Sequence, residues 1–219
     1  MGALFGALKA HGVTEVVMAG AMSRPPLDPA AFDPVMQALA PRLMVAMQGG
    51  DDALLRVVIE IFEEQGFTVR GAHEIDPELT AQSGVLAGAP LTQRQRSDAQ
   101  RAQAILAALS ERDVGQGAVV EGGLCLGIET LQGTDAMLDF VARTPPHLRS
   151  AGGVLVKAPK ADQDLRVDMP TIGPATLKAA DKAGLSAIVV AAQRVIVLEP
   201  SATAALAGAL NISLIAQDF

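Results

Sequence analysis

The chain has 219 residues and a formal net charge of −7, and half of its residues are apolar. This length is enough for two domains that each bury a sizeable core. Tyr and Trp are absent and Phe is scarce, so the core must be built from Ala, Val, Leu, Ile and Met. The acidic balance, with no basic run and no platform of aromatic residues, argues against nucleic acid as a partner.

The cysteine and histidine residues argue against disulfide and zinc sites. Cys125 is the single cysteine, which excludes an intramolecular disulfide and fits a reducing compartment. His11, His73 and His147 are scattered, so we expect no histidine-based zinc centre. His73 follows a predicted strand and is either a ligand contact or a hydrogen-bonded structural residue. No stretch approaches the roughly twenty apolar residues of a spanning helix, and we expect a cytoplasmic protein, with contact to a membrane surface left open.

Residues 1–75 predict an N-terminal α/β domain. Asp33 before Pro34 has the pattern of an N-cap and a first helical residue. One of Asp51 and Asp52 is expected to cap the next helix, and the other is either a first-turn dipole partner or a functional group. In chain order, the expected elements are a helix at 4–11, a strand at 13–19, a helix at 35–47 with a break or restart at Pro41, a helix at 54–62 and a strand at 67–70.

Residues 76–97 predict a linker, because Gly and Pro interrupt a polar stretch that has no sustained hydrophobic periodicity. Residues 98–219 then predict a C-terminal α/β domain whose first helix is capped by Asp98. Its further elements are a hairpin at 117–128, a helix from 133 with a Thr or Asp cap, a strand at 152–156, a helix at 174–183, strands at 186–191 and 194–198, a helix from 201 and a strand at 212–216. The fold class is therefore α/β, with two domains containing mixed sheets.

Charge gathers after the predicted strand at 152–156. Three cations and three carboxylates share one irregular segment: Lys157, Lys160, Arg166, Asp162, Asp164 and Asp168. In α/β folds ligands bind where strands end and helices begin, because loop side chains and free helix N–H groups converge there. The segment predicts a phosphate or pyrophosphate site, and the alternative is a solvated loop with internal ion pairs.

The common nucleotide loops and the serine nucleophile motif are absent from the sequence. The remaining candidates for a reactive site are carboxylates at predicted loop-to-helix junctions, namely Asp51, Asp52, Asp135 and Asp168. Carboxylates around a hard cation such as Mg²⁺ can position a phosphate and activate water. Nearby lysines can neutralise charge on the transferred phosphoryl group.

Several motifs together resemble the LpxI family. They are residues 50–55 (GDDALL), 71–74 (GAHE), 113–120 (DVGQGAVV), 133–138 (GTDAML), 157–160 (KAPK) and 166–173 (RVDMPTIG). They follow the family's order and cover nearly the whole chain. The resemblance implies a UDP-2,3-diacylglucosamine pyrophosphatase of lipid A biosynthesis that needs Mg²⁺ or another divalent cation. It also implies two domains with the substrate between them, and hydrolysis to UMP and 2,3-diacylglucosamine 1-phosphate, which is lipid X.

The resemblance assigns catalysis to the aspartate of the RVDxPTIG motif, which is Asp168 here. We expect Asp168 to hold the metal or the water. Charge alone, and not the resemblance, assigns Lys157 and Lys160 to the pyrophosphate. Further substrate-binding residues are expected at Arg166, Thr171, Asp51, Asp52, Thr134 and Asp135.

Compared with the family pattern, the chain has no opening strand and glycine-rich loop. We therefore expect an incomplete, Rossmann-like N-terminal domain whose exposed sheet edge favours a homodimer. Because substrate and product are lipids, peripheral contact with the inner membrane is expected as well. A nucleotide-sugar or lipid binding module without turnover is the alternative function, and an oxidoreductase is disfavoured by the missing dinucleotide fingerprint.

Overall fold

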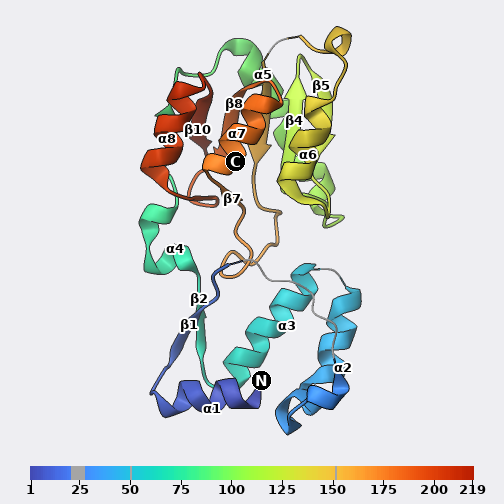
Figure 1. Cartoon of the computed structure of the whole chain (residues 1–219), viewed down its shortest axis with the longest axis vertical. Helices are drawn as coiled ribbons and strands as arrows, with labels where there is room; N and C mark the ends of the chain where they lie inside the picture. Colours follow the sequence, from blue (N-terminus) through green and yellow to red (C-terminus); the bar gives the residue numbers. More distant parts are fainter. Residues whose placement is uncertain (21–27, 50, 151) are drawn as a thin grey trace. The chain divides into compact units, whose positions relative to one another are not determined.

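The structure is a computed structural model that contains two compact units (Figure 1). Unit 1 comprises residues 1–77 with the short segment Asp164–Asp168, and unit 2 comprises Glu78–Gln163 with Met169–Phe219. The predicted mixed α/β class is confirmed, because helices and strands alternate along the chain. The residues described are 1–20, 28–49, 51–150 and 152–219.

Unit 1 contains a parallel pair of strands with Val16 opposite Val69. The Rossmann-like arrangement expected for this domain stays a prediction. The elements of the described part of unit 1 are α1 (Gly2–Ala10), β1 (Glu15–Val17), the 3-10 turn η1 (Pro29–Ala31), α2 (Pro34–Gln48), α3 (Asp51–Glu64), β2 (Thr68–Arg70) and α4 (Ala72–Ile75).

The core of unit 1 is built around aromatic rings, although Phe is scarce in the chain. Phe5, Phe67 and Ile61 are buried. The rings of Phe5 and Phe62 meet edge to face with their centroids 5.2 Å apart. Such pairs add about 0.5–1.5 kcal/mol beyond their buried area. The apolar stripe predicted for α3 therefore faces this core.

The break expected at Pro41 is wrong, since α2 runs without interruption from Pro34 to Gln48. Asp33 caps it as predicted, accepting a hydrogen bond of 2.7 Å from the Met36 N–H. A proline inside a helix costs about 3 kcal/mol. Here the proline is exposed, while its neighbours Ala40 and Leu43 are buried. Packing of those neighbours offsets the cost.

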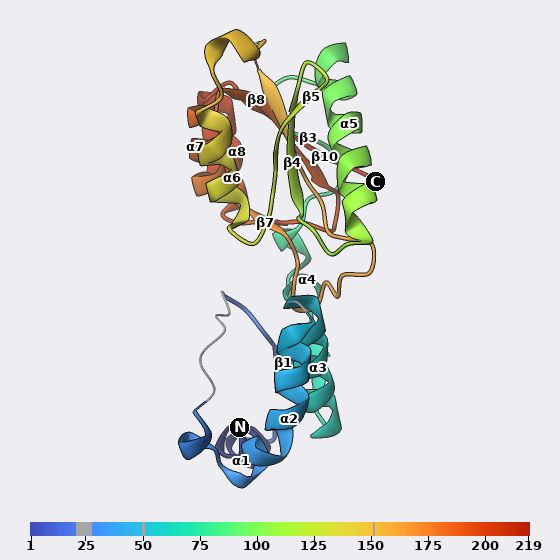
Figure 2. The same ribbon diagram turned by 90° about the vertical axis from the view of Figure 1, so that its right-hand side faces the viewer.

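Unit 2 is organised around a six-stranded mixed sheet in the order β3-β10-β8-β6-β4-β5. Figure 2 shows α5 on one face of this sheet and α6, α7 and α8 on the other. The elements are the 3-10 turn η2 (Pro77–Leu79), which begins at the end of unit 1, and then β3 (Gly84–Ala87), α5 (Gln93–Ser110), β4 (Gly117–Glu121), β5 (Leu124–Ile128), α6 (Gly133–Ala142), η3 (Pro146–Leu148), β6 (Gly153–Lys157), β7 (Thr171–Ile172), α7 (Pro174–Lys182), β8 (Leu185–Ala191), β9 (Ile196–Val197), α8 (Pro200–Ala209) and β10 (Ser213–Gln217).

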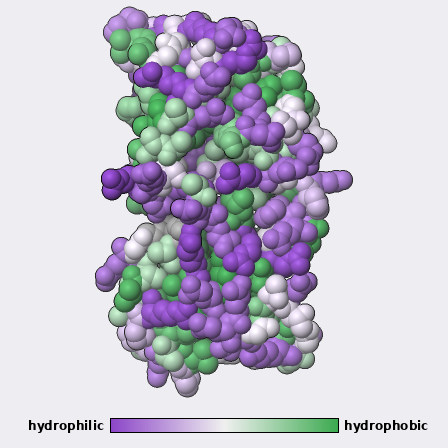
Figure 3. Space-filling model, turned by 180° about the vertical axis from the view of Figure 1, so that it is seen from behind, coloured by the Kyte–Doolittle hydropathy of each residue, from purple (hydrophilic) through white to green (hydrophobic). Residues whose placement is uncertain are grey.

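The core of unit 2 is aliphatic, as the composition predicts. Val154, Leu155 and Val156 of β6 are completely buried, as is Ile188 of β8. Strands covered by helices on both faces read as continuous apolar runs, which is why these strands are visible in the sequence. On the face shown in Figure 3, hydrophilic and hydrophobic residues are interspersed. Among the described helices, none is both long and apolar enough to cross a membrane.

The structure differs from the linker predicted at residues 76–97. Residues Gly84–Ala87 form the edge strand β3, which pairs with β10. The helix expected from Asp98 begins at Gln93, because Thr92 and Gln95 form a capping box ahead of it. Asp98 is buried inside α5, where its carboxylate accepts the N–H groups of Gly122 and Gly123 at 2.9 and 2.7 Å.

Candidate active site

The sheet of unit 2 brings several of the predicted residues to one edge. Strands β6, β8 and β10 are parallel, so their carboxyl ends share an edge. Antiparallel pairing places Gly117, at the start of β4, opposite Lys157, at the end of β6. The end of β5 reaches the same edge, where Ala118 pairs with Ile128. We call this the carboxyl edge, and the residues that follow β5 and β6 lie along it.

Lys157 forms a closed network of side chains at this edge. Its Nζ donates to Glu129 Oε2 and to Thr134 Oγ1, each at 2.7 Å. Thr134 Oγ1 in turn lies 3.1 Å from Glu129 Oε1, to which it donates. Lys157 is 3% exposed and Glu129 is 9% exposed. The lysine expected to bind pyrophosphate is therefore buried and neutralised by a carboxylate within unit 2.

Glu129 was not among the residues predicted from the sequence. It follows β5 and belongs to no recognised motif, but two glycines of the DVGQGAVV motif make room for it. A Cβ on Gly117 would lie 2.5 Å from Glu129 Oε2, and one on Gly115 would lie 2.3 Å from the Glu129 carbonyl oxygen. The glycines in this motif are therefore explained by the space that Glu129 occupies.

Lys160 is held by its own partner. Its ammonium donates to Asp113, which lies just beyond α5. The loop that carries Lys160 is fixed to the end of α5, since the Ala161 N–H donates to Ser110 Oγ at 2.8 Å. Both lysines assigned to pyrophosphate thus have carboxylate partners, and both partners, Glu129 and Asp113, lie outside the charged segment itself.

An open pocket of about 530 Å³ adjoins the Lys160 loop within unit 2. Its lining includes Ala104 and Ala107 of α5 and Ala158 and Pro159 of the loop, with Arg194 as a charged group. Ligand sites of this size are commonly apolar with a few polar groups. The pocket has the composition expected for an apolar portion of a ligand.

Asp168 lies in the segment Asp164–Asp168, which belongs to unit 1. Asp164 organises this turn: its Oδ1 accepts the Arg166 N–H at 3.0 Å, and its Oδ2 accepts from Arg166 Nη2 at 2.7 Å. The Asp168 N–H donates to the Asp164 carbonyl at 3.1 Å. Hydrogen bonds from Arg166 lower the pKa of Asp164 below its usual value, and the bond to Asp164 raises the pKa of Arg166. Asp168, half-buried, is therefore at the end of a charge-stabilised turn.

Gly71 and His73 pack beside this turn in unit 1. A Cβ on Gly71 would lie 2.4 Å from His73 Cε1 and 3.3 Å from Arg166 Cα. The Nδ1 atom of His73 is buried with no hydrogen-bond partner. The hydrogen-bonded structural role considered for His73 thus finds no support at Nδ1.

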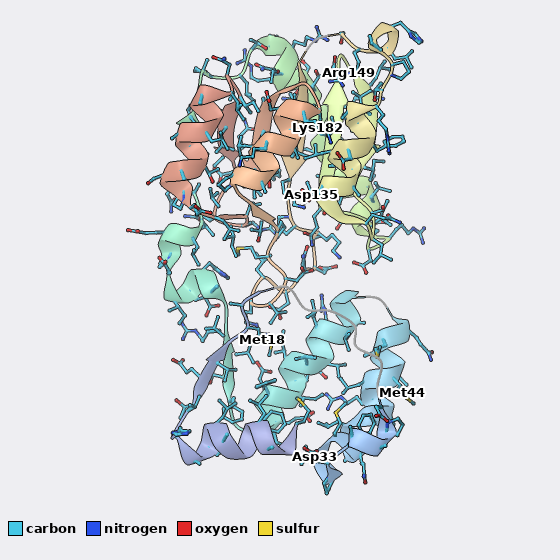
Figure 4. All side chains as sticks on the ribbon, viewed as in Figure 1. Met18, Asp33, Met44, Asp135, Arg149 and Lys182 are labelled. Carbon is cyan, nitrogen blue, oxygen red and sulfur yellow. The ribbon has the colours of Figure 1, made fainter. Side chains whose placement is uncertain are left out.

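The remaining predicted residues have less defined surroundings. Asp135 is exposed in the first turn of α6 (Figure 4), and neither it nor Thr134 caps that helix, since the N-cap is Gln132. Thr171 is exposed in β7 and donates to the Met169 carbonyl at 3.2 Å. Asp51 and Asp52 begin α3, but their side chains lie outside the described part of the structure.

The described residues contain no group of three His, Cys, Asp or Glu side chains placed to hold a metal ion. Mg²⁺, however, usually binds through one or two carboxylates and completes its shell with waters and substrate phosphates. Asp168 offers carboxylate oxygens, the type of donor that Mg²⁺ prefers.

Comparison with known proteins gives the same family for both parts of the chain. The LpxI N-terminal domain matches residues 1–79, and the LpxI C-terminal domain matches residues 82–215. The UDP-2,3-diacylglucosamine pyrophosphatase LpxI of Caulobacter vibrioides is 41% identical over 221 residues, which cover 99% of this chain and 79% of that protein. This chain belongs to the LpxI family.

Proposed function

We propose that this chain hydrolyses the diphosphate bond of UDP-2,3-diacylglucosamine and releases UMP and 2,3-diacylglucosamine 1-phosphate. The observation that carries the proposal is the 41% identity, over 99% of the chain, to the Caulobacter vibrioides enzyme of that name. In the reaction one water adds to a phosphorus and the bond from that phosphorus to the bridging oxygen breaks. Both products are phosphate monoesters whose second pKa is about 6, so about two protons are released near neutral pH.

Asp168 is the proposed catalytic residue. Its position supports this role, because the turn that carries it is fixed by the Asp164 carboxylate and by the guanidinium of Arg166. A reacting group needs such support, since a misplacement of about 1 Å can cost 10²-fold in rate. Arg166 would also supply positive charge near the diphosphate.

Asp168 is also the proposed ligand of Mg²⁺ or another divalent cation, together with the diphosphate oxygens. The bound cation would offset negative charge on the diphosphate and polarise its P–O bonds.

The substrate contacts proposed within unit 2 are cations, hydroxyls and an apolar surface. Lys157 uses two of its three N–H donors for Glu129 and Thr134, and the third could serve the diphosphate. Lys160 would exchange its partner Asp113 for a phosphate oxygen. The pocket beside Ala158 and Pro159 would take part of an acyl chain. Further substrate contacts are proposed for Thr134, Thr171, Asp135, Asp51 and Asp52.

We place the protein in the cytoplasm, and the lipid nature of the proposed substrate and product supports peripheral contact with the inner membrane. A homodimer remains part of the proposal.

The test is to incubate the purified chain with UDP-2,3-diacylglucosamine in detergent micelles and Mg²⁺ and to quantify UMP and the phosphorylated lipid. Release of both products in equal amounts, abolished by a chelator and restored by excess Mg²⁺, supports the proposal. Substrate binding without any UMP release would instead favour the binding module.

A further inference from the structure

We propose that Glu129 is a positioning residue, which holds the Lys157 ammonium and the Thr134 hydroxyl in place at the carboxyl edge. This inference rests on the proposed function, because it explains how Lys157 would be presented to the diphosphate. It concerns a residue that no motif in the sequence indicates.

The geometry leaves the network a single arrangement. Both carboxylate oxygens of Glu129 are used, one by Lys157 and the other by Thr134. The Thr134 hydroxyl donates to Glu129, so the lone pair that accepts from Lys157 is also fixed. The three hydrogen bonds therefore fix the positions of the three side chains, and the Glu129 carboxylate neutralises the Lys157 ammonium.

A second ion pair, between the half-buried Arg149 and the buried Glu121, lies at the opposite end of the strands and provides a comparison. Glu121 ends β4 and accepts from Arg149 Nε at 2.7 Å. Glu121 lies four residues beyond Gly117, roughly 13 Å along the strand. Asp135, near the carboxyl edge, and Arg149 lie toward opposite ends of unit 2 in Figure 4.

The two pairs differ in what they connect. Arg149 donates to the main-chain carbonyls of Ala183 and Gly184, at 2.9 and 3.3 Å, and so joins loops. The hydrogen bonds of Lys157 Nζ instead reach two side chains, Glu129 and Thr134. Burying such a charge pair rarely stabilises a fold relative to apolar residues of similar size. The Lys157 network is therefore better explained by presentation of an ammonium than by stability.

The double variant Glu129→Gln/Lys157→Met separates these explanations. Each single substitution leaves a buried group without its partner and should lower the melting temperature. The double variant should recover most of that loss, yet its kcat/KM should stay about 10²-fold below that of the unsubstituted chain. A well-folded double variant with unchanged kcat/KM would overturn the inference.

Thr134→Val and Thr134→Ser test the network without burying a charge, so they serve if the double variant does not fold. Thr134→Val should lose about tenfold or more in kcat/KM, and Thr134→Ser should retain most of it, since only serine keeps the hydroxyl. Equal kcat/KM in all three chains would contradict the positioning role. Glu121→Gln is the control, expected to lower the melting temperature while leaving kcat/KM unchanged.

Failure of the proposed function would be distinguishable. If the unsubstituted chain releases no UMP, that function fails, and calorimetric titration with UDP-2,3-diacylglucosamine then tests the network. Weaker binding by Thr134→Val than by Thr134→Ser would support the positioning role. Equal binding would overturn it.

Discussion

Arg166 Nη1 donates to Glu63 Oε1 over 2.8 Å, and this ion pair joins residues 103 positions apart in the chain. Glu63 lies near the end of α3, whereas Arg166 lies in the loop that follows β6. The contact helps explain why Asp164–Asp168 clusters with unit 1 although the flanking residues cluster with unit 2. The position of Asp168 therefore depends on α3.

Replacement of Glu63 by Gln should affect turnover more than stability. The pair is half-exposed, and such pairs contribute about 0–1 kcal/mol to folding. We expect a small change in melting temperature but a several-fold fall in kcat/KM, because Arg166 loses an anchor. Glu64→Gln is the matched control, since Glu64 pairs with Arg42 in the same unit. Equal effects of the two substitutions on kcat/KM would contradict the prediction.

The contribution of Asp164 to the free energy of unfolding should fall on acidification. Hydrogen bonds from Arg166 lower the pKa of Asp164 from its ordinary value of 3.8. Because the folded pKa lies below the unfolded one, the stabilising contribution is complete above about pH 4–5 and is lost as pH falls through the folded pKa.

Urea unfolding of the unsubstituted chain and of Asp164→Asn should reveal this contribution. Their difference in unfolding free energy, about 1 kcal/mol, should be constant from about pH 7 to 5 and should shrink below the unfolded pKa. Circular dichroism is the suitable signal, because the chain has no Trp or Tyr. A difference that widens on acidification would refute the sign of the pKa shift.

Gly71 should not tolerate a methyl group. Its φ of −75° is open to any residue, so the cost of Gly71→Ala is steric and arises from His73 and the Arg166 backbone. We expect a loss of about 1–3 kcal/mol of unfolding free energy. Gly6→Ala is the control within α1, where nothing lies within 4 Å of the new Cβ, and it should gain about 0.5–1 kcal/mol. Equal stability of the two variants would show that the packing around Gly71 is looser than described.

Much of the fold follows from local sequence patterns. The hairpin of β4 and β5, the buried strands β6 and β8 and the cap at Asp33 are all confirmed. The start of a helix is harder to predict where two residues could cap it. Asp98 was the predicted cap of α5, but Thr92 caps it. The carboxylate of Asp98 instead binds a hairpin 24 residues away, which no local pattern indicates. Likewise, β3 pairs with β10, the last strand of the chain, and such a distant pairing cannot be predicted from the local sequence pattern.

The candidate site shows the same limit. Charge at a strand exit predicts a site in the segment after β6, because loops converge there, and this stays a prediction. The sequence could not show that Glu129 would neutralise Lys157, since their pairing requires the antiparallel insertion of β4 beside β6. Nor could it show that Asp168 would cluster with residues 1–77.

The most direct test of the account is Mg²⁺-stimulated UMP release by the unsubstituted chain and by Asp168→Asn, measured beside their melting temperatures. Asp168 is half-buried, so the substitution should leave the melting temperature nearly unchanged while turnover falls by about 10²–10⁴-fold. UMP release that survives the substitution, or that disappears only together with the fold, would contradict the catalytic role of Asp168.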